Sequence, residues 1–323
     1  MPRILFVKTS SLGDVVHHCP AVSDAARQMP GATIDWVVEE AFADVAAMHR
    51  SVRRVIPVAL RRWRGSLWRP AAWREFGAFR RALGAERYDF VIDSQGLIKS
   101  ALLAWLARGE RHGPDRHSAR EPLAARFYER RHAVPRALHA VERNRRLAAA
   151  ALGYALDGGC DYGLSARGKA PPAPPPHPYA VLLTMTSRAD KLWPEERWTE
   201  LARALAARGV RAVLPWGSAL ERARCERLAH MLEGAQVPAR MDIAQLARLM
   251  RGAYGVVGVD TGLAHLAAAL GAPTVGVFCG SDPALTGLYG SPRARNLGAP
   301  GRPPAAAEVL AALEAVSLVE AVS

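Results

Sequence analysis

Gly255-Val-Val-Gly-Val-Asp260-Thr-Gly-Leu-Ala-His265 predicts a buried apolar strand that runs directly into a helix. At such a junction, the free N–H groups of the first helical turn and the positive end of the helix dipole face whatever lies beyond the strand. Gly262 allows a ligand to approach the backbone closely. A phosphate group is the expected guest. The alternative interpretation is that Thr261 simply caps the helix and His265 lies on its polar face.

Strands and helices alternate in this way along the whole chain. In the first half, strands are expected at residues 4–9, 33–38, 55–59 and 88–93, and helices at 15–29, 42–49, 71–83, 100–107 and onward to 152. In the second half, strands are expected at 179–186, 210–215, 236–240, 254–260 and 273–278, and helices at 194–208, up to 232, at 243–251 and after 261. This alternation predicts α/β architecture, with parallel sheets covered by helices on both faces.

A proline-rich stretch at residues 170–178 divides the chain into two parts of similar length. Successive prolines exclude a helix or an interior strand and favour an extended spacer. We therefore expect two Rossmann-like, doubly wound domains at residues 1–165 and 179–323, joined by a linker at 166–178. The last helix, expected at 305–322, is apolar enough to pack back on the first domain. Such sheets bind ligands beyond the carboxyl ends of their strands, which predicts a cleft between two sets of loops.

The chain is strongly basic. Its net charge is +13, and the segment from residue 50 to residue 81 holds ten arginines and a single acidic residue. Such a cluster indicates an anionic partner, which could be nucleic acid, an acidic membrane surface or an acidic substrate. Because 39 of the 43 basic residues are arginines, part of the excess of positive charge reflects a general preference for arginine in this sequence. Charge alone does not choose between these partners.

The composition is that of a globular protein, since half of the residues are hydrophobic. The N-terminal apolar run ends at Lys8 and is too short for a signal peptide. The uncharged run at residues 261–281 is interrupted by glycines and a proline, which suits a helix and a strand better than a membrane span. Four cysteines lie far apart, without the paired spacing of a zinc site or a disulfide framework. We expect a soluble cytoplasmic protein.

Two further loops of the second half follow strands and carry polar side chains. Thr186, Ser187 and Lys191 come after one strand, and a lysine ammonium suits the charge of a leaving phosphate. Glu221 follows the next strand, where an acid commonly binds a ribose hydroxyl. Together with Asp260 at the same sheet edge, these residues favour a nucleotide diphosphate site. Taken singly, Lys191 also fits a solvated loop charge and Glu221 a first-turn helix acid.

Several common nucleotide-binding motifs are absent from the sequence. No Gly-x-Gly-x-x-Gly follows an expected strand and no Walker-type Gly-Lys-Ser/Thr occurs, which disfavours a dehydrogenase or a nucleoside triphosphatase. No closely spaced acidic pair offers a metal clamp. The charge of a leaving diphosphate would then be neutralised by Lys191, hydroxyl groups and a helix N-terminus, as in glycosyl transfer without an obligatory metal cofactor.

The first expected strand delivers the loop Lys8-Thr-Ser-Ser-Leu-Gly-Asp14. Gly13 permits a tight turn, and Asp14 is expected to project from the loop toward the nucleotide. A carboxylate in this position could take the proton from an acceptor hydroxyl as that hydroxyl attacks an anomeric carbon with inversion. The alternative interpretation is that Asp14 is an ordinary acid in the first turn of a helix.

Seven motifs spread along the chain together resemble the lipopolysaccharide heptosyltransferases of glycosyltransferase family 9, the type I enzymes above all. They are Lys8-Thr-Ser-Ser-Leu-Gly-Asp14, Asp35-Trp-Val-Val-Glu-Glu40, Arg61-Arg-Trp-Arg64, Asp93-Ser-Gln-Gly-Leu97, Ala119-Arg-Glu-Pro-Leu123, Asp190-Lys-Leu-Trp-Pro194 and Asp260-Thr-Gly-Leu-Ala-His265. The resemblance is weakest in the proline-rich stretch and after Gly290.

The resemblance implies a two-domain GT-B enzyme that transfers L-glycero-D-manno-heptose from ADP-heptose to the Kdo of Kdo-lipid A, with inversion and no obligatory metal. It implies that Asp14 is the catalytic base. The family often has two threonines where Thr186-Ser187 stands, and serine keeps the hydroxyl. The donor site implied by the resemblance consists of Thr186, Ser187, Lys191, Glu221, Met241, Asp260, Thr261, Gly262 and His265.

The basic first half then has a specific explanation, because Kdo-lipid A carries carboxylates and phosphates. The residues expected to contact this acceptor are Lys8, Arg61, Arg62, Arg64 and Arg120. The enzyme is expected to lie peripherally on the anionic cytoplasmic face of the inner membrane. Trp63, Trp68 and Trp73 could insert among the lipid headgroups, and packing in the core is the alternative.

Two other functions compete with this interpretation. A related heptosyltransferase could act on a later acceptor of the core oligosaccharide. The net charge alone would also suit a nucleic-acid-binding protein, but the sequence lacks a helix-turn-helix, a zinc finger and an aromatic RNA-binding strand. We therefore expect no nucleic-acid partner.

Overall fold

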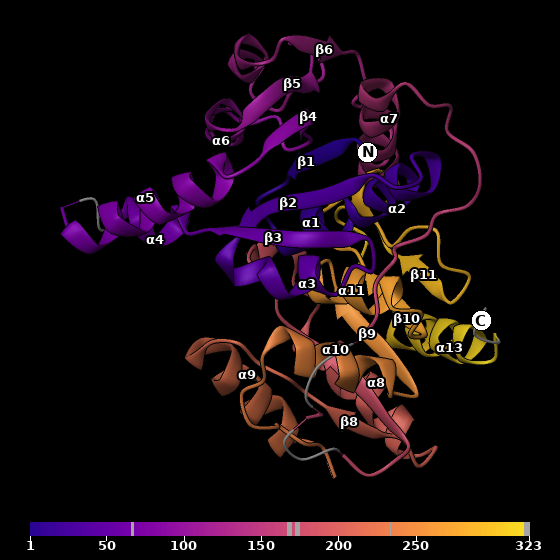
Figure 1. The fold of residues 1–323 in the computed structure, drawn as a ribbon. Coiled ribbons are helices and arrows are strands. Elements are labelled where there is room, and N and C mark those ends of the chain that lie inside the picture. Colours follow the sequence, from indigo (N-terminus) through magenta and orange to yellow (C-terminus); the bar gives the residue numbers. More distant parts are fainter. Residues whose placement is uncertain (66–67, 167–169, 172–174, 233, 320–323) are drawn as a thin grey trace. The chain divides into compact units, whose positions relative to one another are not determined.

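The computed structural model describes residues 1–65, 68–166, 170–171, 175–232 and 234–319. The chain forms two compact units, residues 1–164 and 165–323 (Figure 1). The expected linker at 166–178 falls partly outside the described residues, since 167–169 and 172–174 belong to the undescribed part.

The first unit is built on a parallel sheet of six strands. In chain order these are β1 (Arg3–Val7), β2 (Thr33–Glu39), β3 (Val52–Val58), β4 (Arg87–Asp93), β5 (Arg108–Pro114) and β6 (Arg130–His132). Their spatial order is β3-β2-β1-β4-β5-β6, the doubly wound Rossmann arrangement. The order reverses between β1 and β4, and the loops that follow these two strands therefore lie at the switch point where ligands bind.

Helices cover both faces of this sheet (Figure 1). They are α1 (Leu12–Val16), α2 (Cys19–Gln28), η1 (Glu40–Phe42), α3 (Ala43–Ala47), α4 (Leu60–Arg64), α5 (Pro70–Gly84), α6 (Ile98–Leu106), η2 (Pro122–Phe127) and α7 (Ala140–Leu152). Leu5, Val7 and Val91 of the sheet pack with the apolar residues of α4, α5 and α6. The helix expected at 15–29 is divided into α1 and α2, and Pro20 lies in the first turn of α2, where a missing N–H is tolerated.

The helices expected onward to residue 152 are only partly present: η2 and α7 lie in this segment, but β5 and β6 occupy residues 108–114 and 130–132. Neither strand has the apolar alternation that identifies strands in sequence, and β5 contains two glycines. Both glycines have a packing reason. A Cβ at Gly109 would lie 2.4 Å from the carbonyl oxygen of Tyr88, and one at Gly113 would lie 2.4 Å from the ring of Tyr128. Strand β5 therefore has glycines where other groups approach closely, and it lacks the alternating apolar side chains that identify a strand in sequence.

The second unit contains a parallel sheet in the order β11-β10-β9-β7-β8. The strands are β7 (Tyr179–Leu183), β8 (Arg211–Val213), β9 (Gly255–Val259), β10 (Thr274–Val277) and β11 (Ala294–Leu297). The strand predicted at 236–240 is reduced to a single parallel pairing between Gln236 and Val213. Pro238 has no N–H to extend that pairing. With Gln236 as a vestigial third strand, the order matches that of the first unit, and the switch point lies between β7 and β9.

The helices of the second unit are η3 (Ala189–Lys191), α8 (Glu195–Ala206), α9 (Ala219–His230), α10 (Ile243–Arg251), α11 (Gly262–Ala269), α12 (Pro283–Thr286) and α13 (Ala306–Ser317). Val309, Leu313 and Val316 of the last helix, α13, are buried in the core of the second unit, against α8 and the strands β9 to β11. Residues 320–322 of the expected helix lie outside the described part. Among the described residues, no helix is long and apolar enough to span a membrane.

Replacement of Gly109 by alanine tests the close approach in β5. The added methyl group would meet the Tyr88 carbonyl, a backbone atom of the neighbouring strand that cannot move independently. We expect Gly109→Ala to lower the free energy of unfolding by about 1–3 kcal/mol. Gly84→Ala is the matched control, because a Cβ at the end of α5 has nothing within 4 Å. Equal stability of the two variants in chemical denaturation would contradict this account of β5.

Candidate active site

At the switch point of the first unit, the buried carboxylate of Asp93 fixes the loop after β4. Its Oδ1 accepts hydrogen bonds from the backbone N–H of Gln95 at 2.8 Å and of Gly96 at 3.3 Å. Its Oδ2 accepts hydrogen bonds from the hydroxyls of Ser100 at 2.8 Å and Tyr128 at 2.7 Å. Burial raises the pKa of Asp93, and these four donors oppose that rise. Two of these bonds hold the backbone of the loop, and the other two tie Asp93 to α6 and to the segment after η2.

The side chain of Gln95 joins this loop to the loop after β1. Its Oε1 accepts hydrogen bonds from the backbone N–H groups of Thr9 at 3.1 Å and Ser10 at 3.2 Å. These two bonds fix the orientation of the amide, so that Nε2 points away from them. Gln95 is 3% exposed, and its Nε2 is buried without a hydrogen-bond partner among the described residues. An unused donor therefore lies at the switch point.

Lys8, the first residue after β1, is buried beside these loops. Its Nζ donates hydrogen bonds to the carbonyl oxygen of Ser94 at 2.8 Å and to Oδ1 of Asn144 at 3.3 Å. Burial lowers the pKa of Lys8 to about 8, although the nearby carboxylate of Asp14 acts in the opposite direction. Asn144 on α7 is oriented by a hydrogen bond from its Nδ2 to the carbonyl oxygen of His17. The ammonium of Lys8 is thus held by a helix more than a hundred residues away in sequence.

Asp14 lies in the first turn of α1. Its position fits both an ordinary helix acid and a carboxylate that faces a ligand. Its Oδ2 accepts a hydrogen bond from the backbone N–H of Ser11 at 2.9 Å, as a helix acid would, and Arg120 Nη1 lies 3.4 Å from the same oxygen. Burial acts to raise the pKa of Asp14, but Lys8 and Arg120 outweigh burial, and the net effect lowers the pKa. The carboxylate is therefore ionised at neutral pH and available to accept a proton.

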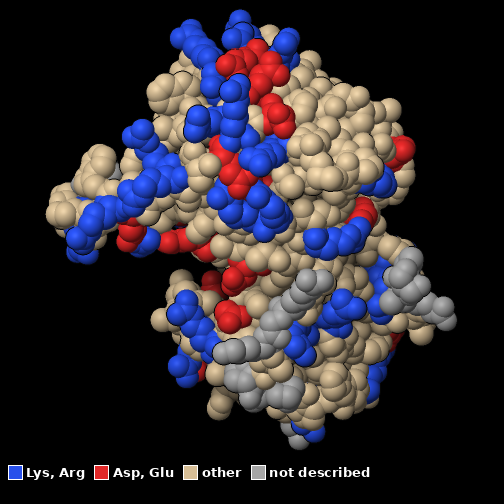
Figure 2. Space-filling model, in the orientation of Figure 1, with Lys and Arg blue, Asp and Glu red and all other residues tan. Residues whose placement is uncertain are grey.

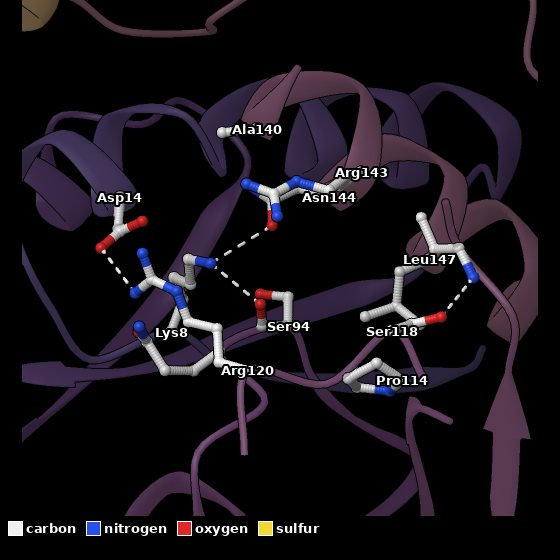
Figure 3. Close-up of a pocket in the computed structure, with 12 residues that line it drawn as sticks. Lys8, Asp14, Ser94, Pro114, Ser118, Arg120, Ala140, Arg143, Asn144 and Leu147 are labelled. Carbon is white, nitrogen blue, oxygen red and sulfur yellow. Dashed lines mark hydrogen bonds and ion pairs between the residues drawn. The ribbon is translucent and has the colours of Figure 1, made fainter. Parts of the chain in front are cut away.

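These groups line one pocket of the first unit (Figure 3). The side chains of Lys8, Arg120 and Arg143 reach toward the same part of the pocket as the carboxylate of Asp14 (Figure 3). The fold brings together Lys8, Asp14 and Arg120, which the motifs and charge of the sequence indicate as site residues. Gln95, Asn144 and Arg143 also line the pocket but were not predicted from the sequence as site residues. The only sequence signal for these was the polar run that follows a buried strand at Asp93 and an Arg-Asn pair within a helix.

The three expected acceptor arginines of α4 line no part of this pocket. Arg61 stacks over the ring of Phe42 at 5.3 Å from its centroid. Arg62 pairs with Glu40 at 2.9 Å and Glu75 at 2.7 Å. Arg64 is exposed and lines a separate, mostly apolar pocket together with Lys99, Trp73 and Phe76.

The three tryptophans next to these arginines differ in environment. Trp63 is buried against Phe76 and Phe79, and its Nε1 donates a hydrogen bond to Glu75 at 2.8 Å. The packing interpretation is therefore the correct one for Trp63. Trp68 and Trp73 are 67% and 60% exposed, and they remain available to a lipid surface.

At the switch point of the second unit, Asp260 is the centre of a polar network. Lys191 Nζ lies 2.6 Å from Oδ2, and the hydroxyl of Ser281 donates to the same oxygen. His265 Nε2 lies 3.4 Å from Oδ1, and Thr186 donates from its hydroxyl to the backbone carbonyl of Asp260 at 2.9 Å. Burial acts to raise the pKa of Asp260, but His265, Lys191 and Ser281 outweigh it and hold the pKa well below its usual range.

The network unites residues from three loops of the second unit. Lys191, which the sequence places at a phosphate site or as a solvated loop charge, forms an ion pair with Asp260. Ser281, which the sequence analysis missed, follows Gly280, where a Cβ would lie 2.5 Å from the carbonyl oxygen of Asp190. This close approach brings the loop after β10 against the loop that carries Lys191.

The other expected donor residues lie at the start of α11 and in other loops and helix starts of the second unit. Thr261 precedes α11 in extended conformation, and its hydroxyl makes no capping bond, so the simple capping interpretation does not hold. Gly262 is the first residue of α11. Ser187 lies exposed in the loop after β7. Glu221 lies in the first turn of α9 and accepts a hydrogen bond from the N–H of Gly217 at 2.6 Å, while Met241 is buried just before α10.

Two Rossmann-like units with polar side chains at their switch points define a GT-B glycosyltransferase fold. Residues 76–309 match the model of glycosyltransferase family 9 (heptosyltransferase). The chain is 51% identical over 290 residues to lipopolysaccharide heptosyltransferase 1 of Pseudomonas aeruginosa, and the alignment covers 89% of this chain and 81% of the relative. The chain therefore belongs to glycosyltransferase family 9.

Two solved structures agree with this assignment. Escherichia coli heptosyltransferase WaaC with ADP matches with a TM-score of 0.89 at 45% identity, covering 97% of this chain and 99% of the other. The E. coli WaaC structure with ADP-2-deoxy-2-fluoro heptose matches with a TM-score of 0.83 at 46% identity, covering 93% and 94%. The protein is thus a glycosyltransferase, and its reaction is heptose transfer in lipopolysaccharide inner-core synthesis.

Asp260→Asn removes the negative partner of Lys191 but keeps the shape of the side chain. Because the folded-state pKa of Asp260 lies below its unfolded value of about 4, its ionised form stabilises the fold above about pH 4. That contribution is lost as the pH falls through the folded-state pKa. We expect the variant to be less stable by about 1–3 kcal/mol at neutral pH, and the difference to shrink below about pH 4.

Chemical denaturation at several pH values measures this difference. Asp190→Asn is the control, since Asp190 forms an exposed ion pair with Arg188 in the same loop and its replacement should change stability little. An Asp260→Asn difference that does not vary with pH would show that the charge of Asp260 does not stabilise the fold.

Proposed function

We propose that this protein transfers L-glycero-D-manno-heptose from ADP-heptose to the Kdo of Kdo-lipid A, with inversion at the anomeric carbon. Relatives named lipopolysaccharide heptosyltransferase 1, and the E. coli WaaC structures with ADP and with an ADP-heptose analogue, support this choice of substrates. The observation that carries the proposal is the ionised Asp14 carboxylate beside Lys8 and Arg120 at the switch point of the first unit.

Asp14 acts as the general base. As the acceptor hydroxyl attacks the anomeric carbon of heptose, its proton passes to the carboxylate of Asp14, and the bond from that carbon to the ADP phosphate oxygen breaks. Attack from the face opposite the leaving group inverts the configuration. Lys8 and Arg120 keep Asp14 ionised before the proton is transferred. The hydrogen bond from Ser11 holds one oxygen in place, so the other, Oδ1, is the better placed to take the proton.

The residues around Asp260 bind the donor. The diphosphate lies at the N-terminus of α11, where Thr261, Gly262 and the helix dipole meet its charge. Lys191 exchanges its partner Asp260 for the diphosphate, and it follows the negative charge that grows on the leaving ADP. Positive charge from a lysine and a helix end takes the part that a metal ion plays elsewhere, so no metal is obligatory in this proposal.

The remaining donor residues complete the site. The hydroxyls of Thr186 and Ser187 contact phosphate oxygens. His265 orients the carboxylate of Asp260 through its contact with Oδ1. Glu221 binds a ribose hydroxyl, as its place after the second strand of the sheet suggests, and the buried Met241 packs against the base.

The acceptor is held by the basic side chains of the first unit at the cytoplasmic face of the inner membrane. Figure 2 shows Lys and Arg side chains gathered along α4 and α5. Arg61, Arg62 and Arg64 lie there, next to the exposed rings of Trp68 and Trp73. Arginines bind the phosphates of lipid headgroups, and tryptophan rings prefer the interface between headgroups and acyl chains. These properties support peripheral attachment of this face to an anionic membrane.

The reaction is tested with purified protein, ADP-heptose and Kdo-lipid A, with EDTA present in a parallel sample. We expect a product with one added heptose, the inverted anomeric configuration by NMR and the same rate with EDTA. An acceptor that already carries heptose should not react. If only the heptosylated acceptor reacts, the protein acts at a later step of core synthesis and the proposed acceptor is wrong.

Asp14→Asn tests the proposed base. Loss of general-base assistance should lower kcat by about 10²–10⁴-fold, whereas the Kd for ADP-heptose measured by calorimetry should stay unchanged. Asp44→Asn is the matched control, because Asp44 is an exposed acid on α3 of the same unit and should leave kcat unaltered. Turnover of Asp14→Asn near that of the unaltered protein would remove Asp14 from this role.

Vesicle binding tests the proposed membrane face. Replacing Trp68 and Trp73 together by serine should weaken co-sedimentation with vesicles that contain phosphatidylglycerol by about tenfold or more. The variant lacks the apolar ring surface that is transferred from water into the membrane on binding. Binding of the unaltered protein should fall as salt rises. Leu220→Ser is the control, because Leu220 is an exposed apolar residue of the second unit. Equal binding by the double variant and the control variant would contradict the assignment of this face.

A further inference from the structure

The pocket that contains Asp14 has more hydrogen-bond donors than acceptors. Arg143, on α7, lines this pocket, and its Nε is buried without a hydrogen-bond partner among the described residues. The same is true of Nε2 of Gln95, whose orientation is fixed by the two backbone bonds to its Oε1. Lys8 uses two of its three ammonium hydrogens, on Ser94 and Asn144. Two donors from different elements therefore lack an acceptor among the described residues, and Lys8 has a third ammonium hydrogen beyond the two that it uses.

The charges of the pocket are also unbalanced. Lys8, Arg120 and Arg143 carry three positive charges, and Asp14 is the only carboxylate among the residues that line it. Asp14 already receives the N–H of Ser11 and the guanidinium of Arg120. Burial and the charge of Arg120 both lower the pKa of Arg143, which shows how unfavourable its present surroundings are for a cation. An anion beside Arg143 would remove that cost.

The size of the pocket limits what that anion is. Its interior holds about 50 Å³, and a single water molecule needs roughly 10–15 Å³ on the same measure. A planar carboxylate group fits this space. The guanidinium of arginine presents paired N–H groups that match the two oxygens of a carboxylate.

We propose that Arg143, Gln95 and Lys8 form a subsite that binds the carboxylate of the acceptor sugar, beside the hydroxyl that Asp14 deprotonates. This proposal rests on the proposed function, because it takes the acceptor to be a sugar acid. The subsite fixes the sugar ring by its acidic group and so selects which hydroxyl meets Asp14. It also separates the tasks of the basic residues, since the arginines of α4 do not line this pocket.

The test compares Arg143→Met with the unaltered protein on two acceptors, Kdo-lipid A and the same molecule with the Kdo carboxylate converted to a carboxamide. On the acid, Arg143→Met should lower kcat/KM by about 10–100-fold, mainly through a higher KM, because a charge-assisted hydrogen bond is lost. On the carboxamide, the unaltered protein should already be slow and Arg143→Met should lower kcat/KM no further. Arg143→Lys, which keeps the charge, should recover part of the loss on the acid.

Arg146→Met is the matched control, because Arg146 is an exposed arginine on the same helix and should behave as the unaltered protein. Direct binding of deacylated acceptor, measured by calorimetry without donor, should weaken in Arg143→Met by a similar factor. ADP-heptose affinity and the midpoint of chemical denaturation should stay the same, which would show that the variant is folded.

Two results would overturn the proposal and leave the proposed function intact. One is an equal loss of kcat/KM for Arg143→Met on the acid and on the carboxamide, which would show that Arg143 has only a structural role. The other is a loss that disappears with dephosphorylated acceptor, which would place a phosphate in the subsite. If the unaltered protein transfers heptose to none of these acceptors, the proposed function itself fails.

Discussion

The chemistry of the first unit depends on the buried Asp93 carboxylate and the Gln95 amide that it positions. Asp93 holds two backbone N–H groups of the loop after β4 and accepts two more hydrogen bonds from Ser100 and Tyr128. The Gln95 side chain of that loop then accepts hydrogen bonds from two N–H groups of the loop after β1. Lys8 begins that second loop, and Asp14 lies in the first turn of the helix that follows it. Each buried polar bond contributes little alone, but an unsatisfied buried partner is costly, so the loops have one low-energy arrangement.

In the second unit, the loops at the switch point are held together mainly by interactions with a charged group, the Asp260 carboxylate. Asp260 gathers Lys191, Ser281 and His265 from loops and a helix that meet at one sheet edge. Both units use the same strand order, yet one ends in a pocket rich in donors and the other in an ion pair beside a helix N-terminus. The fold supplies the place for each site, and the loop residues supply the chemistry.

Many of the strands and several site residues could be predicted from the sequence, because their patterns lie within a few consecutive residues. Apolar strands such as β9 stand out because their pattern is continuous in sequence, and Asp14 and Asp260 stand out because each closely follows such a strand. Strand β5 could not be predicted, because glycines that admit a tyrosine carbonyl and ring leave no apolar pattern. The partners of Lys8 were missed for a related reason, since Asn144 lies 136 residues away and its helix is otherwise unremarkable in sequence.

Helix α7 gives the first unit a particular order of assembly. Its Arg145 forms a buried ion pair with Asp24 at 2.7 Å, which fastens α7 to α2, and its Asn144 contacts Lys8. During synthesis, strands β1 to β6 are complete before this helix has emerged from the ribosome. Contacts between residues so far apart in the chain form late, because they require the longest loop to close. A nascent chain that ends before Ala140 would hold the whole sheet and yet have a pocket open along one side.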